Sequence, residues 1–193
     1  MPHINRIDSR INIVKKLIEP FQLQLNGIVE SVKIQGGEYW DMLYADDTEH
    51  FVGTVFIILQ NYINSSISDL YPELEKIHLK YSIGTKIENT NSTKIQLIIS
   101  MANYYKHRDL PSALHKYTSN TLNDLDIEYK CFYDVQNDKY FHEIGSNSPV
   151  FTGFTKLSEN WDFNDVLDAV AIWRENMWQI EENNTQSLGY GQL

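Results

Sequence analysis

The residues with the most evident chemistry lie in one stretch, residues 102–117, which reads ANYYKHRDLPSALHKY. Within this stretch Arg108 and His115 are separated by six residues. An imidazole exchanges protons near neutral pH, and a guanidinium can hold a phosphate through two parallel hydrogen bonds. The pair therefore predicts a site that handles a phosphodiester with neither a metal nor another cofactor.

The position of this pair depends on where two helices meet. Helical periodicity over residues 94–107 predicts a helix that ends just before Arg108. We expect the next helix to have Asp109 as its cap and Pro111 in its first turn, with His115 one to two turns further on. The free N–H groups at that helix start would favour an anion. The supporting or phosphate-binding residues predicted around the pair are Asn103, Lys106, His107, Asp109, Lys116 and Tyr117.

The segment from Arg108 to Tyr117, RDLPSALHKY, resembles the Arg-x4–6-His motif of the HEPN superfamily of helical domains. The ending His115-Lys116-Tyr117 is similar to the His-x-Tyr ending of some HEPN toxins. The resemblance implies a metal-independent endoribonuclease, usually dimeric, of a bacterial toxin–antitoxin or anti-phage defence system. Arg108 would polarise the phosphate and His115 would transfer the proton. Alanine at either position would then abolish cleavage and leave the fold intact.

A second interpretation assigns these residues no catalytic role. Arg108 could simply pair with Asp109 or with acidic residues in segment 35–49, and His115 could be a polar residue near a helix start. The chain would then be a non-catalytic interaction subunit, such as an antitoxin, immunity or accessory protein, with an acidic binding surface. The two interpretations differ in geometry, because only the catalytic one requires Arg108 and His115 to face one open cleft.

Charge is distributed unevenly along the 193 residues, whose formal net charge is −10. Segment 78–116 carries six Lys and Arg residues against two Asp and Glu, whereas segment 35–77 carries one against eight. An acidic protein is a poor non-specific ligand for nucleic acid, but one focused cationic pocket remains compatible with it. We therefore expect RNA to bind only at a local basic patch around residues 106–116, and a protein partner or homodimer elsewhere.

The same composition predicts a cytoplasmic protein that does not enter a membrane. Cys131 is the single cysteine and has no partner for an internal disulfide. The most apolar stretch, FVGTVFIILQ, is too short to span a bilayer, and the first residues lack the apolar run of a secretory signal.

Periodicity predicts a mainly α fold, a single-domain bundle of four to five helices over residues 1–182. A small β or irregular insert is expected around 129–155, with a hairpin inside it, and the polar residues 183–193 are expected to be a disordered tail. The apolar face of the last helix is so broad that one of Trp173 and Trp178 is predicted to be exposed at a partner surface. The predicted helices cover residues 8–34, 46–70, 94–107, 109–125 and 162–179.

No metal site is predicted. An acidic cluster at the expected start of the second helix could bind a divalent cation through carboxylate oxygens, but helix capping and the helix dipole explain it better. His3, His78 and His142 show no spacing typical of metal ligands. The acidic cluster consists of Asp46, Asp47, Glu49 and His50.

Overall fold

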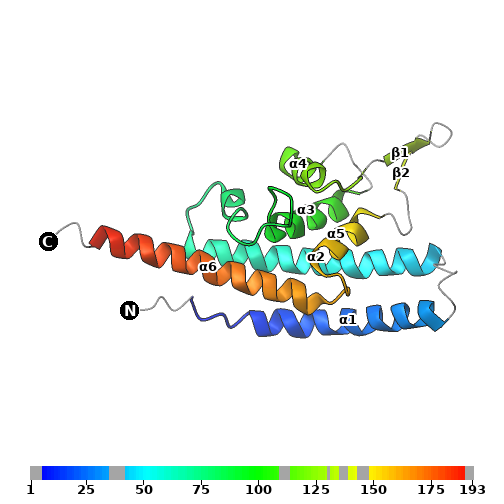
Figure 1. Ribbon diagram of the computed structural model, residues 1–193, viewed down its shortest axis with the longest axis horizontal. Coiled ribbons are helices and arrows are strands. Elements are labelled where there is room, and N and C mark those ends of the chain that lie inside the picture. Colours follow the sequence, from blue (N-terminus) through cyan, green and yellow to red (C-terminus); the bar gives the residue numbers. More distant parts are fainter. Residues whose placement is uncertain are drawn as a thin grey trace.

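Three long helices form the frame of the molecule, as Figure 1 shows. They are α1 (Ile11–Ile34), α2 (Met42–Leu70) and α6 (Phe163–Gly189), and α1 packs against both of the others. The predicted mainly α bundle is therefore confirmed. The computed structural model describes residues 6–34, 42–108, 114–129, 131–134, 139–142 and 148–189.

The shorter helices lie on α2, on the side away from α1 (Figure 1). Among them α3 (Lys94–His107) is central, because it contacts α2, α4 (Lys116–Asp124) and α5 (Pro149–Leu157). A 3-10 helix, η2 (Ile77–Lys80), follows α2 and packs back against it. This second layer, formed by η2, α3, α4 and α5, holds most of the described residues that were predicted to form the site.

The α3 helix has the bounds predicted for it because its start is capped twice. The Thr93 hydroxyl accepts a hydrogen bond from the Gln96 backbone N–H, and the Gln96 side chain accepts one from the Thr93 N–H. Such a reciprocal pair satisfies two backbone donors that a helix start leaves open. The cap fixes the residue at which α3 begins.

The α4 helix starts later than predicted. His115, expected one to two turns inside the helix, is its N-cap, with extended backbone angles (φ −65°, ψ 144°). An imidazole nitrogen can accept a backbone N–H as a cap carbonyl or hydroxyl does, and His115 does so here. Asp109 and Pro111, the residues expected to start this helix, lie outside the described residues.

The predicted hairpin is present as β1 (Cys131–Asp134) paired antiparallel with β2 (Lys139–His142), and it projects from the bundle (Figure 1). The end of the expected insert, however, is helical. Ser148 caps α5 by accepting from the Val150 N–H at 3.2 Å, and Pro149 takes the first turn, where its missing N–H costs nothing. At the other end of the chain, α6 continues through residues 183–189, which the polar composition assigns to a disordered tail.

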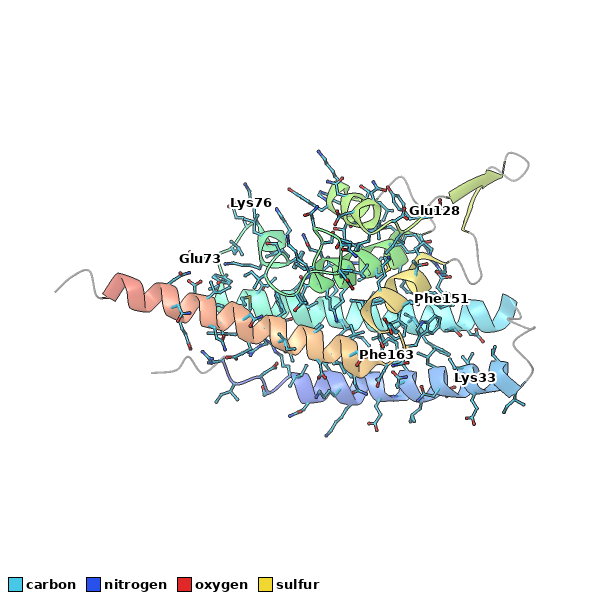
Figure 2. All side chains as sticks on the ribbon, viewed as in Figure 1. Lys33, Glu73, Lys76, Glu128, Phe151 and Phe163 are labelled. Carbon is cyan, nitrogen blue, oxygen red and sulfur yellow. The ribbon has the colours of Figure 1, made fainter. Side chains whose placement is uncertain are left out.

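The core lies where α2, α3, α5 and α6 meet. The Phe154 ring stacks on that of Phe163 with centroids 4.5 Å apart, and Figure 2 marks Phe163 at the start of α6. The expectation of an exposed tryptophan on the last helix is wrong: Trp173 is 1% exposed and Trp178 is 3% exposed. The Trp173 indole N–H donates to the Lys80 carbonyl at 3.0 Å, so burial costs it no hydrogen bond. Nowhere in the described ranges does a helix combine the length and apolar character needed to cross a membrane.

Candidate functional site

A pocket of about 980 Å³ opens between α2, the segment that contains η2, α3 and α4. Its walls are unusually rich in side-chain amides, which can both donate and accept hydrogen bonds. The amide residues are Gln60, Asn64, Asn91, Gln96, Asn103 and Asn120. The ionisable and aromatic residues are His78, Tyr81, Lys106, His115, Tyr117 and Asp124.

One end of the pocket is fixed by the loop that leads into α3. Asp124, near the end of α4, accepts hydrogen bonds from the Ser92 hydroxyl at 2.6 Å and from the Asn91 backbone N–H at 3.0 Å. The Ser92 hydrogen bond is the main reason that the pKa of Asp124 lies below its usual value. By accepting these two hydrogen bonds, the Asp124 carboxylate attaches this loop to α4.

The wall nearest α2 is held by Tyr81 and Thr93. The Tyr81 hydroxyl donates to the Asn64 side-chain oxygen at 2.7 Å, and burial raises the pKa of Tyr81 to about 12. The Thr93 hydroxyl donates to the Tyr81 carbonyl at 2.6 Å. Together these bonds place the segment after η2 against both α2 and the start of α3.

The cation of the pocket is Lys106, and a directed chain of hydrogen bonds holds it. Its ammonium donates to the Gln60 side-chain oxygen at 2.6 Å, Gln60 donates to Asn103 at 2.9 Å, and Asn103 donates to the Thr118 hydroxyl at 3.2 Å. Because an ammonium only donates, it fixes the orientation of the Gln60 amide and, through it, that of Asn103. Burial lowers the pKa of Lys106.

Three aromatic rings stand in a stack at the same pocket. The Tyr117 ring stacks with the imidazole of His78, with ring centroids 4.4 Å apart and an interplanar angle of 25°, and with that of His115, with centroids 5.1 Å apart and an angle of 24°. His78 comes from η2, whereas His115 and Tyr117 begin α4. The Tyr117 residue is 54% exposed, so the stack stands at the surface rather than in the core.

The helix cap determines which nitrogen of His115 carries the proton. Its Nδ1 accepts the Tyr117 backbone N–H at 3.4 Å, so the neutral imidazole holds its hydrogen on Nε2. In this tautomer Nε2 donates a hydrogen bond and cannot accept a proton. The geometry thus suits His115 to binding an acceptor better than to acting as a general base.

Arg108 lies elsewhere, at the end of α3. Its guanidinium pairs with Glu49 at 3.0 Å, and the two side chains are 17% and 3% exposed. It also contacts His50 Nε2 at 3.2 Å and lies over the Tyr105 ring, 5.0 Å from the centroid. Since Arg108 only donates, His50 accepts at Nε2 and has its hydrogen on Nδ1, which lies 2.6 Å from the Tyr105 hydroxyl.

The Arg108 cluster, formed by Glu49, His50, Tyr105 and Arg108, is separated from the pocket along α2. Lys106 reaches Gln60, whereas Arg108 reaches Glu49. At 1.5 Å rise per residue these two positions on α2 are about 16 Å apart. The acidic segment 35–77 thereby neutralises one cation of the predicted basic patch, and Lys106 remains as the lysine of the pocket.

The structure thus separates the predicted site residues: some line the pocket, and Arg108 belongs to the Arg108 cluster. Asn103, Lys106, His115 and Tyr117 line one pocket, and Arg108 does not line it. His107 and Lys116 are exposed beside it without lining it, and Asp109 lies outside the described residues. The catalytic pairing of Arg108 with His115 stays a prediction.

His78 and Gln60 are among the pocket residues that sequence reasoning missed. Each lies far along the chain from residues 102–117, and neither belongs to a recognisable spacing. Only the packing of η2 and α2 against α3 and α4 brings them to the pocket. No local pattern could have indicated either one.

Among the described residues, no group of three or more His, Cys, Asp or Glu side chains is arranged to hold a metal ion. Glu49, from the acidic cluster considered for a cation, faces Arg108 instead. No model of a protein family, no curated protein and no solved structure matches this chain. The resemblance to HEPN domains therefore rests on the residues from Arg108 to Tyr117 and on the mainly helical architecture.

Proposed function

We propose that this chain binds single-stranded RNA in the pocket between α2, α3 and α4. The observation that carries the proposal is the meeting of Lys106 with the aromatic stack of His78, Tyr117 and His115 in one amide-rich pocket. Phosphate requires a cation or N–H donors, bases favour aromatic faces, and base edges and ribose hydroxyls pair with amides. All three kinds of group are present here.

The size and charge of the molecule favour a single strand over a duplex. A pocket of about 980 Å³ is at the upper end of the range for small-ligand sites, which accommodates a short stretch of chain but not a double helix. A duplex is held mainly by many phosphate contacts, which a protein of net charge −10 cannot supply. Among the described lining residues, one lysine and one carboxylate, Asp124, stand in a wall that is otherwise mostly uncharged and amide-rich, which suits one or two nucleotides rather than a long run of phosphates.

A metal-independent endoribonuclease of the HEPN type is the second candidate. It is favoured by the presence of two imidazoles and an ammonium in one pocket, groups that can move a proton and stabilise a phosphorane without a metal. Two contacts favour binding over cleavage. Arg108 pairs with the buried Glu49, and the Nδ1 of His115 is engaged by the α4 cap. A role in toxin–antitoxin or anti-phage defence would follow from the family resemblance.

The proposal is tested by RNA binding with and without the pocket cation. Lys106→Gln keeps a donor for Gln60 but removes the charge, so we expect about tenfold weaker binding of a fluorescent single-stranded RNA and a salt dependence lower by about one phosphate contact. Lys33→Gln is the matched control, because Figure 2 places Lys33 at the end of α1, far from α3 and α4. Equal losses in both variants, or no RNA binding by the wild type, would contradict the proposal.

The same samples separate binding from cleavage. If the chain only binds, the labelled RNA stays intact over the time of the titration, with or without a chelator. If it is the endoribonuclease, RNA is cut in the presence of EDTA and the products carry cyclic phosphate ends, since the neighbouring 2′-hydroxyl attacks. Either result is read on one denaturing gel.

A further inference from the structure

We infer that His78, Tyr117 and His115 form a stacking platform for an RNA base, and that the base adds to the stack on the exposed side of His115. This inference rests on the proposed function and deepens it, because it assigns a role to rings that no sequence pattern identified as a unit. Tyr117 is the ring that stacks with both imidazoles, and His115 is the ring to which the base would be added.

The first support is the regular geometry of the three rings. Both interplanar angles are close to 25°, so the rings face the same way to within a modest tilt. His115 is an exposed residue, and Tyr117 covers only one of its faces. A further flat ring placed against the other face would continue an arrangement that already exists, with no change in the fold.

The second support is that a contribution to stability does not by itself account for the stack. Tyr117 is 54% exposed, so this residue removes less apolar area from water than a core tyrosine does. The η2 segment is already attached to the body by other contacts, among them the bond from Trp173 to the Lys80 carbonyl. The rings are therefore available for a ligand, and His78 serves as a positioning residue because its imidazole stacks with the Tyr117 ring.

The third support is the position of the platform relative to the cation. Lys106 lines the same pocket as the three rings and is held in place through Gln60. A nucleotide carries a flat base and a charged phosphate side by side, which is the combination that these two features would accept. Stacking requires only a π face, so the platform would accept any of the four bases and would discriminate against a paired strand.

The test uses two substitutions of His115 that separate the role of its ring from its role as the cap of α4. His115→Ser removes the ring but keeps a good N-cap, whereas His115→Phe keeps a ring but removes the cap acceptor. If the base stacks on the ring, His115→Ser weakens RNA binding by roughly 5- to 100-fold with little change in melting temperature, and His115→Phe binds close to wild type despite a lower melting temperature. If His115 only caps α4, the order of the two variants reverses.

A second RNA with abasic riboses completes the test. Wild type should bind the abasic strand more weakly by about the factor that His115→Ser loses, and His115→Ser itself should not distinguish the two strands. Equal wild-type affinity for both strands would overturn the platform while leaving RNA binding intact. Equal losses in His115→Ser and His115→Phe would also overturn it, in favour of an Nε2–H donor role. Failure of wild type to bind either strand would overturn both this inference and the proposed function.

Discussion

The ion pair between Arg108 and Glu49 makes a prediction that separates a structural arginine from a catalytic one. The Glu49 side chain is 3% exposed, so replacing Arg108 by Ala leaves a nearly buried carboxylate without its cation. Removing one partner of a fully buried pair costs about 3–5 kcal/mol. Because the Arg108 side chain retains 17% exposure and water can partly replace it, we expect a loss of about 2–3 kcal/mol.

In a chain of this length each kcal/mol lowers the melting temperature by about 2–4 °C, so Arg108→Ala should melt about 4–12 °C below wild type. Circular dichroism at 222 nm would follow the transition, and urea unfolding would give the free energy directly. Adding Glu49→Gln to Arg108→Ala removes the buried negative charge that Arg108 had faced, and the double variant should recover at least about 1 kcal/mol of the loss. That recovery identifies the pair itself as the cause.

A catalytic Arg108 predicts a different pattern: stability is unchanged and RNA cleavage is lost. An Arg108→Ala variant that melts with wild type would therefore refute the ion-pair argument, and with loss of cleavage it would restore the catalytic interpretation. A large loss of stability that Glu49→Gln does not relieve would also count against the argument, because it would show that Arg108 stabilises the fold through other contacts, such as those with Tyr105 and His50.

Two further predictions concern the loop that leads into α3. Thr93→Ala removes the hydroxyl half of the capping box and should cost about 1 kcal/mol, measured by urea unfolding, whereas Thr93→Ser should restore most of it; equal stability of all three proteins would show that the cap contributes nothing. Asp124 has its pKa lowered chiefly by the Ser92 hydroxyl, so it stabilises the fold above its unfolded pKa and this stabilisation is lost as pH falls through the lower folded pKa. The difference in melting temperature between wild type and Asp124→Asn should accordingly be present at pH 7 and shrink as pH falls below about 4; a constant difference would refute the assignment.

The parts of the fold that could be predicted are those in which one strong local pattern decides. The α3 bounds followed from the helical periodicity of residues 94–107, and the observed capping box at Thr93 accounts for the start. The start of α4 could not be predicted in the same way, because Asp109 with Pro111 and the observed cap His115 are both plausible helix starts. Helix α5 is only nine residues long and follows a run of turn-forming residues, so its signal, Ser148 before Pro149, was weaker than that of its surroundings.

The candidate site illustrates a different limit, since its partners come from distant parts of the chain. The non-catalytic interpretation allowed Arg108 to pair with Asp109 or with acidic residues of segment 35–49, and Glu49 does pair with Arg108. The sequence could not predict which of these acidic residues Arg108 would meet. The choice depends on how α3 is rotated against α2, which is set by the buried residues of both helices rather than by the charged ones.

The rotation of α3 also explains why residues of one sequence motif lie at two separate sites, the pocket and the Arg108 cluster. Successive residues of an α-helix turn by about 100°, so Asn103 and Lys106 share a face, as do Tyr105 and Arg108, whereas Lys106 and Arg108 point about 200° apart. Arg108 keeps helical backbone angles (φ −55°, ψ −34°), so this relation extends to it. The helical pattern alone therefore separates Lys106 from Arg108. It follows that the lysine, and not the arginine, is the cation of α3 that shares a pocket with His115.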